Sequence, residues 1–402
     1  MHKRRIISAV LGATMLFSLA ACSSKTEETT ELTTTSETTA APTEEETTTT
    51  EEEVIETTVL EVSDLYDPSN PNAVNPVTGV QDMDPANVGK RIVGISVNNY
   101  YEALPQRGVS QADAIYEFET EAGKTRFVAL FADVNTVPLI GSLRSARYMS
   151  TDICRSLNAV FIHWGGNKYV INYINESNVD HVEGNNCATS FKSADAEGNV
   201  DLPKNTFFWR NQDWKSRSLE HTGVSNGTHI LEAIEHYDID LNGEAPLLFN
   251  FTKAPSKNLE NAGDCAEINV VFSQAIQDCN FKYDAASNLY MKSAKGKPQI
   301  DETTGEQIGF TNVVVLYANI HQKDIQPDLR DATFTDGGEG WYASNGKIVK
   351  ITWAQDSKDE PFKLFAEDGS ELKVNIGKSY ICVVDDDVAD QTTITETAAV
   401  EE

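Results

Sequence analysis

The sequence predicts an α/β or α+β N-terminal domain with a mixed sheet, followed by a smaller all-β antiparallel C-terminal domain. Two observations predict this division. Between residues 75 and 240, strand-like and helix-like patterns alternate along the chain, as they do in α/β and α+β domains. Between residues 265 and 385, short runs of alternating apolar and polar residues are separated by turn residues, which is typical of an antiparallel β domain.

The individual elements follow from hydrophobic periodicity. In the N-terminal domain, strands are expected at residues 91–97, 114–118, 125–134, 137–140 and 158–164. Helices are expected at residues 143–157, 169–175 and 227–237, the last of them capped by Ser225 or Asn226. In the C-terminal domain, strands are expected at residues 267–272, 280–283, 289–292, 312–317, 347–353 and 379–384. The polar segment 247–263 is the expected linker between the domains.

The N-terminus has the features of a secretory signal peptide, because basic residues 3–5 precede an apolar run and small residues. The tetrapeptide Leu19-Ala20-Ala21-Cys22 resembles the lipobox of bacterial lipoproteins. In that family the signal is cut before the cysteine, which then carries the lipid. The resemblance implies that residues 1–21 are removed and that Cys22 anchors the chain on the outer face of the plasma membrane. The alternative is an ordinary signal peptide followed by a chance cysteine.

The net charge of −30 is concentrated at the two ends of the mature chain. Residues 22–64 are mostly Thr, Glu and Ser, which predicts a disordered tether behind the lipidated cysteine. Residues 386–402 are expected to form a disordered acidic tail. This excess of acid argues against nucleic acid as a partner and against contact with anionic lipid head groups. A basic partner is permitted, but a solvated acidic surface is the simpler interpretation.

The cysteines indicate neither a metal site nor a redox motif. Five remain besides Cys22, at wide and irregular spacings without a C-x-x-C pattern: Cys154, Cys187, Cys265, Cys279 and Cys382. Because five is an odd number, at least one thiol is expected to be unpaired, and the sequence does not tell which of them pair. No cofactor and no metal are expected.

Several segments resemble the YerB-type lipoprotein family of Gram-positive bacteria. They are residues 97–99, 105–113, 115–117, 125–127, 140–147, 163–166 and 208–210, and more loosely residues 312–315 and 345–353. The match is strongest over Ile140-Gly141-Ser142-Leu143-Arg144-Ser145-Ala146-Arg147. The resemblance implies a two-domain extracytoplasmic lipoprotein and supplies no reaction. Relatives often carry a histidine before the aspartate of Pro298-Gln299-Ile300-Asp301, where this chain has Gln299.

The best candidate for a binding site is the segment that carries Arg144 and Arg147. If Ser142 caps the helix that follows, the two arginines lie three apart on its first turns. Positive charge is unfavourable there, so its presence indicates a function. A helix N-terminus with two guanidinium groups would bind a carboxylate or a phosphate. The alternative is a pair of structural salt bridges to one or more of the preceding acids Glu117, Glu119 and Glu121.

His163 is a weaker candidate, because it ends an apolar strand and precedes Gly165 and Gly166. Ligands often bind at such strand ends, and Gly165 and Gly166 are therefore candidate binding residues. A histidine there can act as a general acid or base, with Glu117 as a further catalytic candidate. A hydrogen-bonded core histidine is the simpler interpretation. The glycine pair matches no nucleotide-binding pattern.

Three other patterns are explained more simply by structure. Gly223-Val224-Ser225-Asn226-Gly227 fits the G-x-S-x-G pattern, but its polar approach favours helix capping. His229 and His236 share a helix face without further metal ligands in the sequence nearby. The aromatic residues around Trp209 and Trp214 are expected to anchor a loop, although they could bind a sugar or a peptide.

These observations favour a lipid-anchored protein that binds an anionic component of the cell envelope or a protein partner. One alternative is an envelope-acting hydrolase or transferase, with His163 as acid or base and Arg144 and Arg147 holding the substrate. The other alternative is a non-catalytic scaffold that docks a membrane partner. A single open pocket containing these residues and Glu117 would favour a ligand site, whereas closed ion pairs would favour a scaffold.

Overall fold

The computed structural model describes residues 64–396, apart from 185–186, 196–198, 274–276 and 324–327. These residues belong to one compact unit. The predicted signal peptide, Cys22, nearly all of the predicted tether and the last six residues lie outside the described part of the chain. No helix among the described residues is long and apolar enough to cross a membrane.

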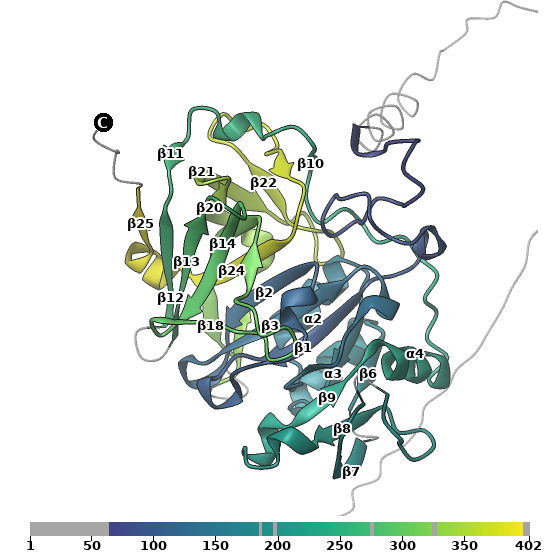
Figure 1. Cartoon of the computed structure of the whole chain (residues 1–402). Coiled ribbons are helices and arrows are strands. Elements are labelled where there is room, and N and C mark those ends of the chain that lie inside the picture. The colour runs from purple at the N-terminus through teal and green to yellow at the C-terminus, as the bar shows by residue number, and fades with distance from the viewer. Residues whose placement is uncertain (1–63, 185–186, 196–198, 274–276, 324–327, 397–402) are drawn as a thin grey trace, which may run out of the picture. The chain divides into compact units, whose positions relative to one another are not determined.

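An eleven-stranded mixed sheet runs through both halves of the chain, in the order β11-β21-β20-β17-β24-β2-β3-β1-β5-β6, with β22 paired to β21 (Figure 1). The N-terminal half supplies β1 (Val93–Asn98), β2 (Ala114–Glu119), β3 (Thr125–Phe131), β5 (Val160–His163) and β6 (His181–Glu183). The C-terminal half supplies β11 (Gly263–Asp264), β17 (Asn312–Ala318), β20 (Gly338–Ser344), β21 (Lys347–Ala354), β22 (Lys363–Phe365) and β24 (Ser379–Asp385). The two halves join where β2 pairs in parallel with β24.

The C-terminal half is rich in strands, but it is not entirely antiparallel, which corrects the expectation from sequence. β24 pairs in parallel with β17 as well as with β2. A parallel pair needs a crossover connection, which antiparallel neighbours do not. The chain between β17 and β24 supplies it, because it forms β20, β21 and β22 on one side of β17 before it crosses to the other side as β24.

A second sheet packs against one face of the eleven-stranded sheet. It has the order β15-β14-β13-β12-β25, with β16 paired to β14. Its strands are β12 (Glu267–Ser273), β13 (Gln277–Asp284), β14 (Leu289–Ala294), β15 (Lys297–Pro298), β16 (Gly309–Phe310) and β25 (Thr393–Thr395). Because β25 pairs with β12 and Val388 is buried, residues 386–396 belong to the fold, and the prediction of a disordered tail is wrong for them.

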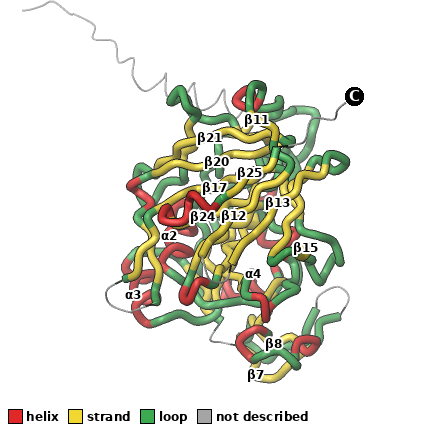
Figure 2. Tube along the Cα trace, turned by 90° about the vertical axis from the view of Figure 1, so that its left-hand side faces the viewer, coloured by secondary structure: helices red, strands yellow, loops and turns green. Residues whose placement is uncertain are grey.

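The alternation of side chains along β24 explains why this strand is apolar throughout. Tyr380, Cys382 and Val384 face a core shared with the second sheet. Ile381 and Val383 face the opposite core, to which the helices α2 (Tyr148–Ser156) and α3 (Lys168–Glu176) contribute. A strand buried on both faces has no polar side. Figure 2 shows these helices on one side of the strands.

Shorter elements complete the fold. A four-stranded sheet has the order β4-β9-β8-β7, from β4 (Ile140–Gly141), β9 (Gly223–Ser225), β8 (Phe208–Asn211) and β7 (Cys187–Lys192). Two further pairs are β10 (Phe251–Thr252) with β23 (Val374–Asn375), and β18 (Ile320–Gln322) with β19 (Arg330–Ala332). The aromatic side chains of Trp209 and Trp214 are buried against the four-stranded sheet, which supports their anchoring role.

The expected helix 143–157 is wrong in its first turn, because α2 begins only at Tyr148. Residues 142–147 are extended, and tertiary hydrogen bonds to β1 and to residues 164–165 hold them so. Ser142 therefore caps no helix, and Arg147 occupies the N-cap position. For α4 (Gly227–His236) the prediction is confirmed, with Asn226 as the cap: its side chain accepts a hydrogen bond from the His229 backbone N–H.

Candidate functional site

Residues 142–147 lie across the carboxyl ends of β1 and β5, which run in parallel. On one side, the Arg144 N–H donates to the carbonyl of Ser96 at 3.0 Å. On the other, the Trp164 N–H donates to the carbonyl of Arg144 at 2.9 Å, and the Ala146 N–H donates to that of Gly165 at 2.9 Å. The segment is thus fixed by backbone bonds at the kind of sheet edge where ligands bind in open α/β sheets.

This placement brings three arginines together, which we call the arginine cluster: Arg126, Arg144 and Arg147, with the acids Glu121 and Glu220. Arg144 Nη2 lies 2.8 Å from Glu220 Oε2, and Arg147 Nε lies 2.6 Å from Glu121 Oε1. Arg126 projects from β3, and its Nη1 donates to the Ser145 carbonyl at 2.7 Å. The cluster therefore holds three cations and two anions.

Arg126 has the least compensated charge in the cluster. Its side chain is nearly buried, with 5% of the residue exposed. Across residues 64–396, outside the gaps noted above, no carboxylate lies within ion-pair distance of its guanidinium, and its Nε has no hydrogen-bond partner. Burial lowers the pKa of Arg126, and the charges of Arg147 and Arg144 lower it further. The charges of Glu121 and Glu220 raise this pKa, but neither acid pairs directly with Arg126. A buried cation without a direct ion pair is costly, so its position needs an explanation.

The two acids of the cluster are ionised at neutral pH. Burial alone would raise the pKa of Glu121, but the Arg147 charge and hydrogen bond lower it below its usual value. The hydrogen bond from Arg144 lowers the pKa of Glu220 despite partial burial. Glu220 is 57% exposed and Glu121 is 27% exposed at the side chain, whereas Arg144 and Arg147 are 22% and 13% exposed. Solvent therefore reaches the cluster from the side of Glu220.

His163 lies at the end of β5 and is fully buried. Its Nδ1 lies 2.8 Å from the Gly165 carbonyl, which can only accept, so Nδ1 carries the proton. Its Nε2 lies 2.9 Å from His181 Nδ1, which must therefore be the donor in that bond. Burial lowers the pKa of His163 to about 3, and the neighbouring His181 lowers it too. His163 is thus a neutral histidine with both ring nitrogens occupied.

Glu117 lies in a separate buried network at the junction of the two halves. Its Oε1 accepts hydrogen bonds from Asn99 Nδ2 at 2.6 Å and from Thr125 Oγ1 at 2.5 Å. Its Oε2 accepts from the Tyr380 hydroxyl and lies 3.6 Å from Lys292 Nζ. Both Glu117 and Lys292 are completely buried. Glu117 is therefore paired within the core and does not join Arg144, Arg147 and His163.

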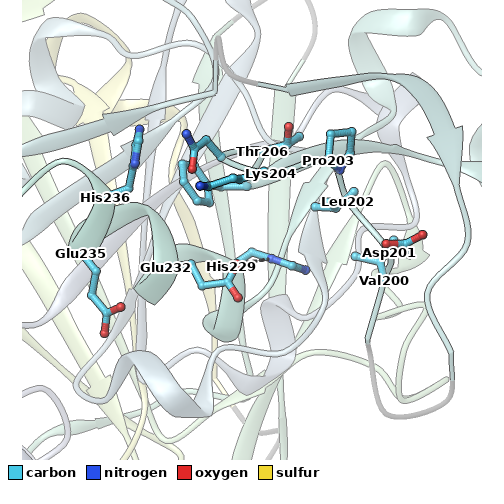
Figure 3. Close-up of a pocket in the computed structure, with 12 residues that line it drawn as sticks. Val200, Asp201, Leu202, Pro203, Lys204, Thr206, His229, Glu232, Glu235 and His236 are labelled. Carbon is cyan, nitrogen blue, oxygen red and sulfur yellow. Dashed lines mark hydrogen bonds and ion pairs between the residues drawn. The ribbon is translucent and has the colours of Figure 1, made fainter.

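The remaining candidates have structural partners. Ser225 lies in β9, and its hydroxyl donates to the Phe207 carbonyl at 2.8 Å. His229 Nδ1 lies 2.8 Å from Glu232 Oε2, beside a surface cavity of about 620 Å³. Figure 3 shows His229 and His236 apart along α4. The five cysteines besides Cys22 are free thiols, and all but Cys187 are buried.

Within the described residues, one group of three side chains is close enough to share a metal ion: Asp385, Asp386 and Asp387. It includes neither histidine of α4. These are largely exposed neighbours in the chain, and exposed acidic groups of this kind are common without an ion.

Sequence reasoning missed Arg126 and Glu220. Arg126 had a detectable signal, because a charged residue stands in an otherwise apolar strand, Thr125-Arg126-Phe127-Val128. Glu220 had none, because it reaches Arg144 from a polar loop 76 residues further along the chain. Glu121 was among the acids expected as structural partners, and it does pair with Arg147.

Comparison with known proteins agrees with this architecture. The family described as protein of unknown function (DUF3048) matches with its N-terminal domain over residues 77–240 and with its C-terminal domain over residues 268–381. YerB of Bacillus subtilis (strain 168), which is named as a lipoprotein, is 26% identical over 314 residues, 77% of this chain and 86% of YerB. The crystal structure of YerB from Bacillus subtilis aligns with a TM-score of 0.64 at 24% identity, covering 80% of this chain and 99% of that chain.

Proposed function

Given that the chain belongs to the YerB-type family and that its two halves match the two DUF3048 domains, we propose that it is a lipid-anchored protein. Its proposed location is the outer face of the plasma membrane of a Gram-positive bacterium. We further propose that it binds an anionic component of the cell envelope at the arginine cluster. The proposed location rests on the lipobox-like tetrapeptide ending in Cys22 and on the name of the Bacillus relative. The binding function rests on the geometry of the cluster.

The observation that carries the binding function is the nearly buried Arg126, which forms no direct ion pair with a carboxylate of the described residues. Its fixed position beside Arg144 and Arg147 keeps three guanidinium groups together against their mutual repulsion. A carboxylate or phosphate oxygen would offset that repulsion and accept charge-assisted hydrogen bonds. Guanidinium groups suit such ligands because their planar donors match two oxygens at once. The ligand class is therefore a carboxylate- or phosphate-bearing envelope component.

The arrangement gives less support to a hydrolase or transferase. A general base must be able to take up a proton and must reach the substrate. His163 is buried, has both nitrogens occupied and has a pKa of about 3. Glu117 is committed to Lys292 and Tyr380. The ion pairs of Arg144 with Glu220 and of Arg147 with Glu121 favour the scaffold alternative by the criterion set out above. A scaffold at the same location would not, however, need Arg126 to be charged.

The test is the stabilisation of the protein by inorganic phosphate at constant ionic strength. A ligand that binds only the native state raises the melting temperature. We expect phosphate to raise it by a few degrees relative to chloride in the wild-type chain, and not in Arg126→Gln. Arg155→Gln is the matched control, because Arg155 pairs with the exposed Asp359 outside the cluster. An equal phosphate response in all three proteins would contradict the proposal.

A further inference from the structure

A second pocket lies where the two halves of the chain meet, away from the residues of the arginine cluster. It has a volume of about 540 Å³, within the range of small-molecule sites. One wall comes from the N-terminal half, at Tyr101, Leu104 and Pro105. The other wall is the turn between β14 and β15 and the residues after it, 294–300. The Glu302 N–H donates to the Gln106 carbonyl at 2.8 Å beside it and ties the walls together.

The floor of this pocket is pre-formed, and its polar groups are already satisfied. Gln299 lines the pocket but is only 3% exposed. Its Nε2 donates to Asn99 Oδ1 and to Gln106 Oε1, each at 3.0 Å. Its Oε1 accepts from the buried Lys292 Nζ at 2.6 Å. Because the amide of Gln299 is fully bonded within the protein, recognition of a ligand falls to the walls and the rim.

The walls are mainly apolar. Leu104, Pro105, Pro298 and Ile300 all line the pocket. Tyr101 is 47% exposed and is one of five large hydrophobic side chains left exposed among the described residues. An apolar ligand group that covers this concave surface would gain binding free energy of about 25 cal/mol per Å² of apolar area removed from water.

The rim is positively charged. Lys295 Nζ lies 4.6 Å from the centre of the Tyr101 ring, and Lys297 lines the same pocket. Among the described residues, neither lysine has a carboxylate within ion-pair distance. Many other described lysines also lack an ion pair, so the significance of these two lies in their position at the rim of an apolar pocket. Two unpaired lysines on an apolar recess make it selective for the sign of a ligand's charge.

We propose that this pocket binds an amphiphilic anion. The apolar body of the ligand packs between Tyr101, Leu104 and Ile300, and Lys295 and Lys297 hold its carboxylate or phosphate. A free fatty acid and a single lipid with an anionic head group share this chemistry, and on the lipid-anchored chain of the proposed function both are within reach. The net charge of −30 disfavours broad contact with an anionic membrane surface, whereas the two lysines attract a single anionic group locally. The site is independent of the arginine cluster, because the two share no residue.

The test uses a fluorescent fatty acid, 11-(dansylamino)undecanoate, on the full chain carrying Cys22→Ala, so that no lipid of its own competes. We expect saturable binding that decanoate reverses and that decanol reverses at least tenfold less well. Lys295→Gln/Lys297→Gln should weaken binding about tenfold. Lys350→Gln is the matched control, because Lys350 also lies over an aromatic ring, that of Trp341, and should bind as the wild type does.

Two results would overturn the proposal: binding unchanged in the double variant, or binding lost equally in Lys350→Gln. Tyr101→Asp provides a second variant that should lose binding through the wall rather than the rim, and unchanged binding there would also count against the proposal. Vesicles identify the source of the ligand. Displacement by phosphatidylglycerol vesicles but not by phosphatidylcholine vesicles supports a lipid head group, whereas displacement by monomeric decanoate alone supports a free acid.

Discussion

At the residue scale, the buried charges of this protein fall into two kinds. Glu117 and Lys292 neutralise each other in a network that also satisfies their remaining hydrogen-bonding capacity. Arg126 is nearly as deeply buried but has only a backbone carbonyl as a charge-accepting partner within the described chain. The first kind explains how the two halves are held together. From the second kind, the charge of Arg126, we infer that the protein binds an anion.

Breaking the Glu117–Lys292 pair should be strongly destabilising. Glu117→Gln leaves a buried, unpaired ammonium, and we expect it to lower the free energy of unfolding by about 3–5 kcal/mol. Glu117→Gln/Lys292→Met should recover a large part of that loss, because it removes the stranded charge. Urea unfolding measures both. Lys347→Met, which breaks the exposed pair with Asp264, is the control and should cost about 1 kcal/mol or less. Similar losses for the two ion pairs would contradict this expectation.

His163 should make stability fall as the pH drops. Its pKa in the folded protein, about 3, lies below the value of 6.5 for a free histidine. Its contribution is therefore complete above about pH 6.5 and is lost progressively as the pH falls toward 3. Below about pH 6, His163→Gln should lose stability less steeply than the wild type, by about 1 kcal/mol per pH unit. Denaturant unfolding between pH 7 and 5 measures the slopes, and identical slopes would show that His163 titrates normally.

At the scale of elements, local pattern predicted the strands better than the start of a helix. The six expected runs of the C-terminal half correspond to β12, β13, β14, β17, β21 and β24. The segment 142–147 failed because its conformation is set by backbone bonds to Ser96 and to residues 164–165, which no local pattern reports. Arg144 and Arg147 were thus singled out from a helix turn that does not form. They remain candidate binding residues because they lie beside Arg126, which projects from β3.

The cap of α4 offers a test at this scale. Asn226 Oδ1 accepts a hydrogen bond from the His229 N–H at 3.0 Å, so Asn226→Ala should lower the free energy of unfolding by about 1 kcal/mol. Asn226→Ser should keep most of that stability, because a hydroxyl can cap the same N–H. Thermal melts followed by circular dichroism measure the difference. An alanine variant as stable as the wild type would mean that the cap contributes nothing.

At the scale of the whole molecule, sequence predicted two halves, and the family domains divide the chain in a similar place. The sequence did not indicate that the halves share one sheet. Pairing between β2 and β24 joins residues 265 positions apart, such as Glu117 and Cys382. The apolar pattern of each strand would fit equally well in a sheet formed by its own half alone. Long-range pairing of this kind depends on the complete fold, which single-strand patterns do not report.

Neither half should therefore fold alone. Residues 64–262 would leave β2 without β24, and residues 263–396 would leave β24 without β2 and Lys292 without Glu117. We expect each half, produced separately, to lack a cooperative thermal transition, and the undivided chain to show one. Differential scanning calorimetry makes the comparison. A cooperative transition in either isolated half would show that the shared sheet is dispensable for folding.

The shared sheet also constrains how the protein can mature. If the chain leaves the cytoplasm from its N-terminus, as the predicted signal peptide would direct, β2 emerges early and β24 emerges almost last. Until then, one edge of β2 has no neighbouring strand and Glu117 lacks Lys292 and Tyr380. The early part of the chain therefore remains open to proteases and to aggregation. Secretion along the proposed route would then be coupled in time to folding, because a chain whose translocation stops before residue 379 lacks β24 and cannot complete its central sheet.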